Sequence, residues 1–215
     1  MNKIIVKNAL SAIALLIFVM LASGSFNAKV TVDSINKAKS TLRDSLSDIR
    51  TDSTKTTAEV DSAYSQLKSY LDKRNISDRN LRNLEDRLTT IQTKYANLED
   101  SFESAKKDGK ELFALLNRRA KENDTRELRK RMLKDIGTKE DEFNAKIDKA
   151  EVVLSKIEKS IKKYDDIVGF VQVNKGLQGI DDLIADIEAT MKVGTTLNSE
   201  IRNNIDDGLR LIASL

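Results

Sequence analysis

The sequence predicts an all-α protein: an elongated antiparallel coiled-coil bundle of three long helices plus a shorter, kinked fourth. Two observations lead to this fold class. Apolar residues recur at alternating spacings of three and four, which forms the narrow apolar seam of helices that pack lengthwise, whereas strands need a period of two. The 215 residues also include no Pro and only eight Gly, so the chain lacks the turn residues that β-sandwiches and nucleotide-binding folds require.

The first seam runs from Val32 to Tyr70, and nine of its twelve positions are apolar, which predicts a helix over 29–73. Ser53 and Thr56 occupy seam positions within a stretch rich in Ser and Thr. Such side chains compete for backbone hydrogen bonds and interrupt the apolar seam. We therefore expect this helix to fray or bend there.

The second seam predicts a helix over 78–121, with ten of its eleven positions apolar and Gly109 as the exception. The third seam predicts a helix over 125–173, with Glu140 as its only polar position. Between the two, the continued spacing reaches only polar residues. A turn is therefore expected near 122–125, with Asp124 as the N-terminal cap of the next helix. The alternative is one continuous helix that bridges the change of phase.

Gly176 is expected to end the third long helix, because glycine is common just beyond a helix C-terminus. The apolar pattern then predicts a shorter helix over 177–213, kinked or interrupted at the Gly-Thr-Thr segment 194–196, where the phase shifts. Short connections between helices of similar length favour antiparallel neighbours. These features complete the predicted bundle.

The N-terminus predicts export. Lys3 and Lys7 give a positive start, residues 9–22 form an apolar run, and small residues follow, so 1–24 is predicted to be a signal peptide. The alternative is an uncleaved membrane anchor, although a spanning helix needs about 20 apolar residues. The remaining chain, 25–215, is predicted to be a single elongated helical coiled-coil domain. Its expected location is periplasmic or secreted, with membrane association as a further expectation.

The composition argues against catalysis. The chain has no His or Cys, which excludes His-based triads, thiol nucleophiles and ordinary zinc sites. No Gly-rich phosphate loop is present, and acidic clusters on heptad helices are typical of solvated faces. We therefore predict no enzyme, no cofactor and no metal site.

The net charge argues against a nucleic-acid partner. Two of the 37 basic residues lie in the predicted signal peptide and all 34 acidic residues lie beyond it, so the remaining chain has a net charge of +1.

Basic residues concentrate around the turn between the second and third helices. Residues 106–134 hold eleven Lys or Arg and five acidic residues. Such a surface favours anionic partners such as phospholipid headgroups. The alternative is a solvated tip, partly neutralised by Asp206 and Asp207 and without aromatic residues that would insert into lipid. The residues predicted to contact an anionic surface are Arg118, Arg119, Lys121, Arg126, Arg129, Lys130 and Arg131.

Two apolar features suggest further contacts. Residues 167–173 form the most apolar stretch outside the signal. We interpret them either as a membrane-inserting segment or as a helix end buried on several sides, and they are too few to cross a bilayer. The heptad seams either satisfy one another within the chain or bind the helices of a second copy, so a homo-oligomer is a predicted partner.

Short motifs, most of them in the C-terminal half, carry a resemblance. They are Lys-Ala-Lys at 37–39, Lys-Ala-Glu at 149–151, Asp-Ile-Val at 166–168 and Leu-Ile-Ala-Ser-Leu at 211–215. In this arrangement the chain resembles an exported bacterial all-helical family of unknown function. The resemblance implies an exported all-helical envelope protein, and it carries over no functional residues.

These features predict a non-enzymatic exported coiled-coil protein that acts as an envelope scaffold, by self-association or by contact with an anionic membrane surface. Other envelope proteins are expected partners. The alternative is a periplasmic chaperone or binding module that clasps clients between helical arms. A helical toxin or adhesin is a third interpretation, which the lack of a long apolar hairpin disfavours.

Overall fold

A computed structural model describes residues 30–74, 76–173 and 180–215. The chain divides into two units, Met1–Val30 and Thr31–Leu215, and the second unit contains all the helices of the described residues. The predicted signal peptide and Gly176 lie outside the described residues.

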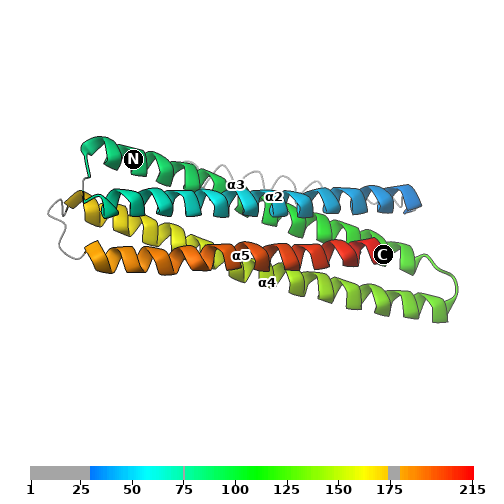
Figure 1. Ribbon diagram of the computed structural model, residues 1–215. Helices are drawn as coiled ribbons and strands as arrows, with labels where there is room; N and C mark the ends of the chain where they lie inside the picture. The colour runs from blue at the N-terminus through cyan, green and yellow to red at the C-terminus, as the bar shows by residue number, and fades with distance from the viewer. Residues whose placement is uncertain (1–29, 75, 174–179) are drawn as a thin grey trace. The chain divides into compact units, whose positions relative to one another are not determined.

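Four helices and no strand make up the described residues, which confirms the all-α prediction (Figure 1). Each helix begins and ends within three residues of its predicted bounds. The fourth is the shortest, with 35 residues against 41, 44 and 48 for the others. In chain order, the helices are α2 (Val32–Asp72), α3 (Asp78–Lys121), α4 (Arg126–Val173) and α5 (Ile180–Ser214).

Hydroxyl caps explain where α2 and α3 begin. The Thr31 side chain accepts a hydrogen bond from the Ser34 N–H at 3.1 Å, and the Ser77 side chain accepts one from the Asn80 N–H at 3.2 Å. Each bond satisfies one of the backbone N–H groups that the first helical turn leaves without a partner.

The turn between α3 and α4 is present, so one continuous helix is excluded. The predicted cap at Asp124 is wrong by one residue, because Thr125 directly precedes the first helical residue. Asn123 Oδ1 accepts a hydrogen bond from the Thr125 N–H at 3.0 Å. This Asx turn directs the chain into α4.

Two predicted helix breaks do not occur. The helix α5 runs without interruption through 194–196, and a kink at that place stays a prediction. The helix α2 continues through its Ser- and Thr-rich stretch because the hydroxyls bond to backbone carbonyls: Thr57 Oγ1 donates to Ser53 O at 2.8 Å, and Thr56 Oγ1 donates across to Lys94 O at 3.1 Å. No fraying follows, and a bend there stays a prediction.

The four helices form a bundle in which α2 and α4 each lie against both α3 and α5 (Figure 1). Hydrogen bonds between α2 and α3 pair later residues of one helix with earlier residues of the other. These pairs are Ser45 with Asp108, Asp52 with Ser101 and Glu59 with Lys94.

The seam positions fill the bundle interior. Tyr64 of α2 and Tyr164 of α4 are fully buried and meet edge to face, with ring centroids 5.4 Å apart. Their hydroxyls donate to backbone carbonyls, Tyr64 to Ser160 O at 2.7 Å and Tyr164 to Leu84 O at 3.4 Å. A buried hydroxyl needs such a partner, so the aromatic pair fixes three helices at one level.

Gly109, the exception in the second seam, has a packing role. A Cβ atom at this position would lie 2.5 Å from Cε1 of Phe143, whose ring is only 1% exposed. Phe143 also contacts Phe113, with ring centroids 5.8 Å apart. The missing side chain on α3 therefore makes room for a large one on α4.

A basic end of the bundle as the candidate functional site

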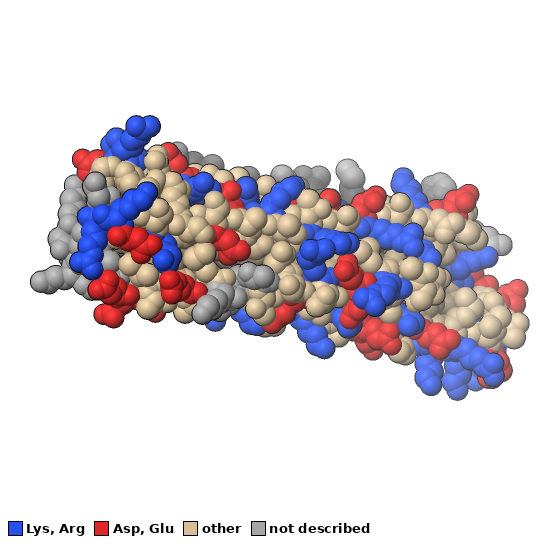
Figure 2. Space-filling view, in the orientation of Figure 1, with Lys and Arg blue, Asp and Glu red and all other residues tan. Residues whose placement is uncertain are grey.

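The seven basic residues that the sequence singled out meet at the α3–α4 turn. Arg118, Arg119 and Lys121 lie in the last turn of α3, and the other four lie in the first two turns of α4. Figure 2 shows basic side chains gathered where α4 begins. Five of the seven are exposed, namely Arg118, Lys121, Arg126, Lys130 and Arg131. We call these seven residues the basic end.

Most of the charge at the basic end is not neutralised by neighbours. Arg119 Nη1 pairs with Glu122 at 3.1 Å, and Arg129 Nη1 donates to the Asn123 carbonyl at 3.4 Å. Within the described residues, none of the five exposed cations has a carboxylate oxygen within 4.0 Å. These cations are therefore directed to solvent.

The acids that were expected to neutralise this end bind elsewhere. Asp206 pairs with Arg50 of α2 at 3.4 Å, and Asp207 pairs with Lys146 of α4 at 2.5 Å. The Lys146 ammonium holds the pKa of Asp207 below its usual value. Partial neutralisation of the basic end by these two acids was the wrong expectation, because the register of α5 brings them to other cations.

Not all of the basic segment 106–134 belongs to this site. Lys106 contacts Glu103, at 3.6 Å, and Glu151 of α4, and it is 31% exposed. The Glu151 carboxylate raises the pKa of Lys106. This residue joins α3 to α4 within the bundle wall, so Lys106 is not part of the surface available to a partner.

Sequence reasoning missed an apolar component of the basic end. Leu128 is 47% exposed, and Met132, four residues later on the same face of α4, is half-buried and packs against the core. Arg129 and Arg131 lie on either side of this face. The spacing of four was visible in the sequence, but both residues precede the third seam and show no periodic run of their own.

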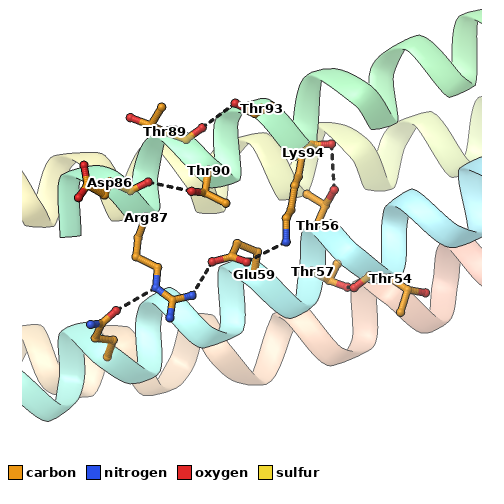
Figure 3. Close-up of polar contacts among 11 residues, drawn as sticks. Thr54, Thr56, Thr57, Glu59, Asp86, Arg87, Thr89, Thr90, Thr93 and Lys94 are labelled. Atoms are coloured by element: carbon orange, nitrogen blue, oxygen red, sulfur yellow. Dashed lines mark hydrogen bonds and ion pairs between the residues drawn. The ribbon is translucent and has the colours of Figure 1, made fainter. Parts of the chain in front are cut away.

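A second polar cluster lies between α2 and α3 (Figure 3). The carboxylate of Glu59 accepts from Arg87 at 2.5 Å and from Lys94 at 2.8 Å, while Arg87 Nε donates to Gln66 Oε1 at 3.0 Å. The hydrogen bond from Lys94, with a further one from Arg87, lowers the pKa of Glu59 although burial opposes the shift. Because these charges satisfy one another, the cluster stabilises the helix pair and presents no reactive group.

The apolar stretch 167–173 is partly buried and partly exposed. Ile167, Val168 and Val171 are buried in the core, as the interpretation of a buried helix end expects. Phe170 is 42% exposed and Val173 is 82% exposed. The exposed pair lies at the opposite end of α4 from the basic end.

In the part of the chain that the structure describes, no group of three or more His, Cys, Asp or Glu side chains could hold a metal ion. Within the same ranges, no helix is both long and apolar enough to cross a bilayer. The chain matches no protein-family model, no curated protein and no solved structure. The family resemblance therefore stays a prediction.

Proposed function

We propose that this protein is an exported, non-enzymatic envelope scaffold that binds anionic membrane surfaces through its basic end. The observation that carries the proposal is the set of five exposed cations without carboxylate partners at one end of the bundle. The proposed location, periplasmic or secreted, rests on the signal peptide predicted at 1–24.

Electrostatic attraction of this size suits reversible attachment. Each Lys or Arg near an anionic bilayer contributes about 1 kcal/mol, and the attraction decays over a Debye length of about 8 Å at physiological salt. Five clustered cations therefore support binding that salt weakens strongly. Charges spread evenly over a surface would not act together at one contact.

The rest of the chain serves in this proposal as a stiff support, an antiparallel coiled-coil bundle. Reversed pairing between α2 and α3 and burial of the seam residues support that arrangement. Because the seams face one another inside the bundle, membrane contact is the leading mechanism and self-association the second one.

A cosedimentation assay tests the proposal. The full-length gene is expressed, the N-terminus of the purified protein is identified by mass spectrometry, and the protein is spun with phosphatidylglycerol or phosphatidylcholine vesicles at low and high salt. We expect pelleting only with phosphatidylglycerol vesicles, and its loss at high salt. Pelleting without vesicles supports self-association instead.

Matched variants assign the binding to the basic end. Replacement of Arg126, Lys130 and Arg131 by Gln is expected to abolish pelleting, because it removes three of the five exposed cations. The control replaces three exposed lysines farther along α4 and is expected to pellet normally; they are Lys149, Lys159 and Lys162. Equal loss in both variants contradicts a site at this end.

A wild-type protein that stays in the supernatant under all conditions removes the membrane proposal. Client binding is then the next hypothesis, and it is tested with an unfolded outer-membrane protein.

A further inference from the structure

We infer that the first two turns of α4 insert Leu128 into the headgroup and upper acyl region of an anionic bilayer. The inference rests on the proposed function and adds to it the apolar part of the contact. It explains why an exposed leucine lies beside the cations of the basic end, whereas Met132 on the same face packs against the core.

The position of this segment makes it accessible. The first turn of α4 reaches past the end of α3 and past the C-terminal end of α5 (Figure 1). At that place Leu128 is 47% exposed, although an unpartnered leucine gains free energy from leaving water. A projecting end can enter a planar, fluid surface, whereas a protein partner would have to offer a matching hollow.

The side chains around Leu128 have the pattern of an interfacial helix. Leu128 and Met132 are four residues apart and therefore lie on one face, with Arg129 and Arg131 at its two borders. Long basic side chains lay their methylene stems along apolar surface while their charged groups reach phosphates. The same residues can therefore serve both parts of the contact.

The other end of α4 shows that charge selects the inserting end. Phe170 is exposed to nearly the same degree as Leu128, at 42% against 47%. Its neighbours Asp165 and Asp166 are exposed acids of α4. An anionic surface repels these carboxylates, so exposed apolar area alone does not predict insertion.

Environment-sensitive fluorescence tests the inference on the full-length exported protein. The chain contains no Cys, so Leu128→Cys and Phe170→Cys each carry one nitrobenzoxadiazole label without further changes. With phosphatidylglycerol vesicles, we expect the emission of the label at 128 to shift to the blue and to be quenched by lipids with spin labels near the headgroup. The label at 170 is expected to keep its emission.

Because the label is itself apolar, unlabelled variants provide a second measurement. Leu128→Ser is expected to weaken vesicle binding about fivefold, since half a leucine side chain no longer leaves water. Phe170→Ser, the matched control, is expected to bind as the wild type does. Equal circular dichroism spectra and thermal transitions establish that both variants fold.

The outcomes separate the inference from the proposed function. Salt-sensitive binding with no emission shift at 128 and no loss in Leu128→Ser overturns insertion and leaves the electrostatic contact in place. No binding of the wild type to phosphatidylglycerol vesicles removes both. The same emission shift with soluble poly-glutamate alone overturns the bilayer as the ligand and indicates an acidic protein partner.

Discussion

At the scale of single residues, Gly109 decides how closely α3 and α4 approach. Helix propensity alone predicts that Gly109→Ala would stabilise the protein by about 1 kcal/mol. The new Cβ atom would lie 2.5 Å from the Phe143 ring, which is almost fully buried and packs against Phe113. We therefore expect Gly109→Ala to lower the free energy of unfolding by about 1–3 kcal/mol, measured by urea denaturation.

Two other helical glycines supply the control for this prediction. Apart from the chain neighbours and the nearby backbone of α4 itself, no atom lies within 4 Å of a Cβ built at Gly137 or Gly169. Alanine at either position is expected to raise the free energy of unfolding by about 0.5–1 kcal/mol. A similar gain in Gly109→Ala would contradict the tight contact with Phe143.

Glu59 links stability to pH through its two cations. Its folded-state pKa is lowered from 4.5, chiefly by the hydrogen bond from Lys94. A lowered pKa means that the carboxylate stabilises the fold above its unfolded pKa, and that this stabilisation is lost as the pH falls through the folded value. Glu59→Gln is therefore expected to be less stable than the wild type at pH 7, by about 1–3 kcal/mol because Arg87 and Lys94 lose a charged partner, with a smaller difference at pH 3.

Urea denaturation at the two pH values measures this difference. Glu127→Gln, which removes an exposed carboxylate on α4, is the control and is expected to show no comparable change. A stability difference for Glu59→Gln that is equal at pH 7 and pH 3 would mean that the carboxylate charge is not what matters.

At the scale of helices, charge distinguishes α5 from its neighbours. Among the described residues, five ion pairs join α5 to α2 or α4 and a sixth joins it to Arg74, just beyond the end of α2; in each of them the acid belongs to α5. The pairs are Arg50–Asp206, Lys68–Glu188, Arg74–Asp181, Lys146–Asp207, Lys156–Glu200 and Lys163–Asp186. This pattern favours one placement of α5, between two helices that offer cations.

An exchange of charges tests that placement. Lys156 and Glu200 are 3.3 Å apart and about half exposed, so their coupling is expected to be about 0.2–1 kcal/mol. Glu200→Lys alone should lower the free energy of unfolding, and adding Lys156→Glu should restore most of the loss. The recovery should shrink in high salt, because screening weakens an exposed pair. Additive effects of the two substitutions would show that these side chains do not interact.

The helices were predictable because their signals are local. Heptad spacing gave the number of helices and their ends, which follow from neighbours in sequence. The cap at Asp124 was wrong because Asn123 folds back onto the Thr125 N–H, a geometry that residue type alone does not specify. The excess of acidic residues in 177–215 was visible in the sequence. The cations that pair with these acids lie on α2 and α4, and the sequence does not show which residues pair because this depends on how the helices are aligned.

At the scale of the whole molecule, sequence reasoning found the cations of the basic end but not what surrounds them. All seven predicted residues lie at one turn, because the turn was correctly predicted. Asp206 and Asp207 were expected there, but α5 places them farther along the bundle, where they pair with Arg50 and Lys146. Leu128 was missed because an isolated apolar residue has no period, and its exposure is a property of the assembled helices.

The basic end predicts how the protein stands on a membrane. Leu128 and Phe170 lie on one uninterrupted helix and are separated by about 63 Å at 1.5 Å per residue. If only the basic end binds, α4 stands upright on the bilayer and holds Phe170 far from the lipids.

Resonance energy transfer from a donor dye at position 128 or 170 to acceptor-labelled lipids measures this orientation. The dyes are chosen so that their Förster distance is shorter than the separation of the two positions. We expect efficient transfer from position 128 and little from position 170. Efficient transfer from both would mean that the bundle lies flat, so that cations along α4, such as Lys149, Lys159 and Lys162, would share in binding, and the control variant in the sedimentation assay would then lose affinity as well.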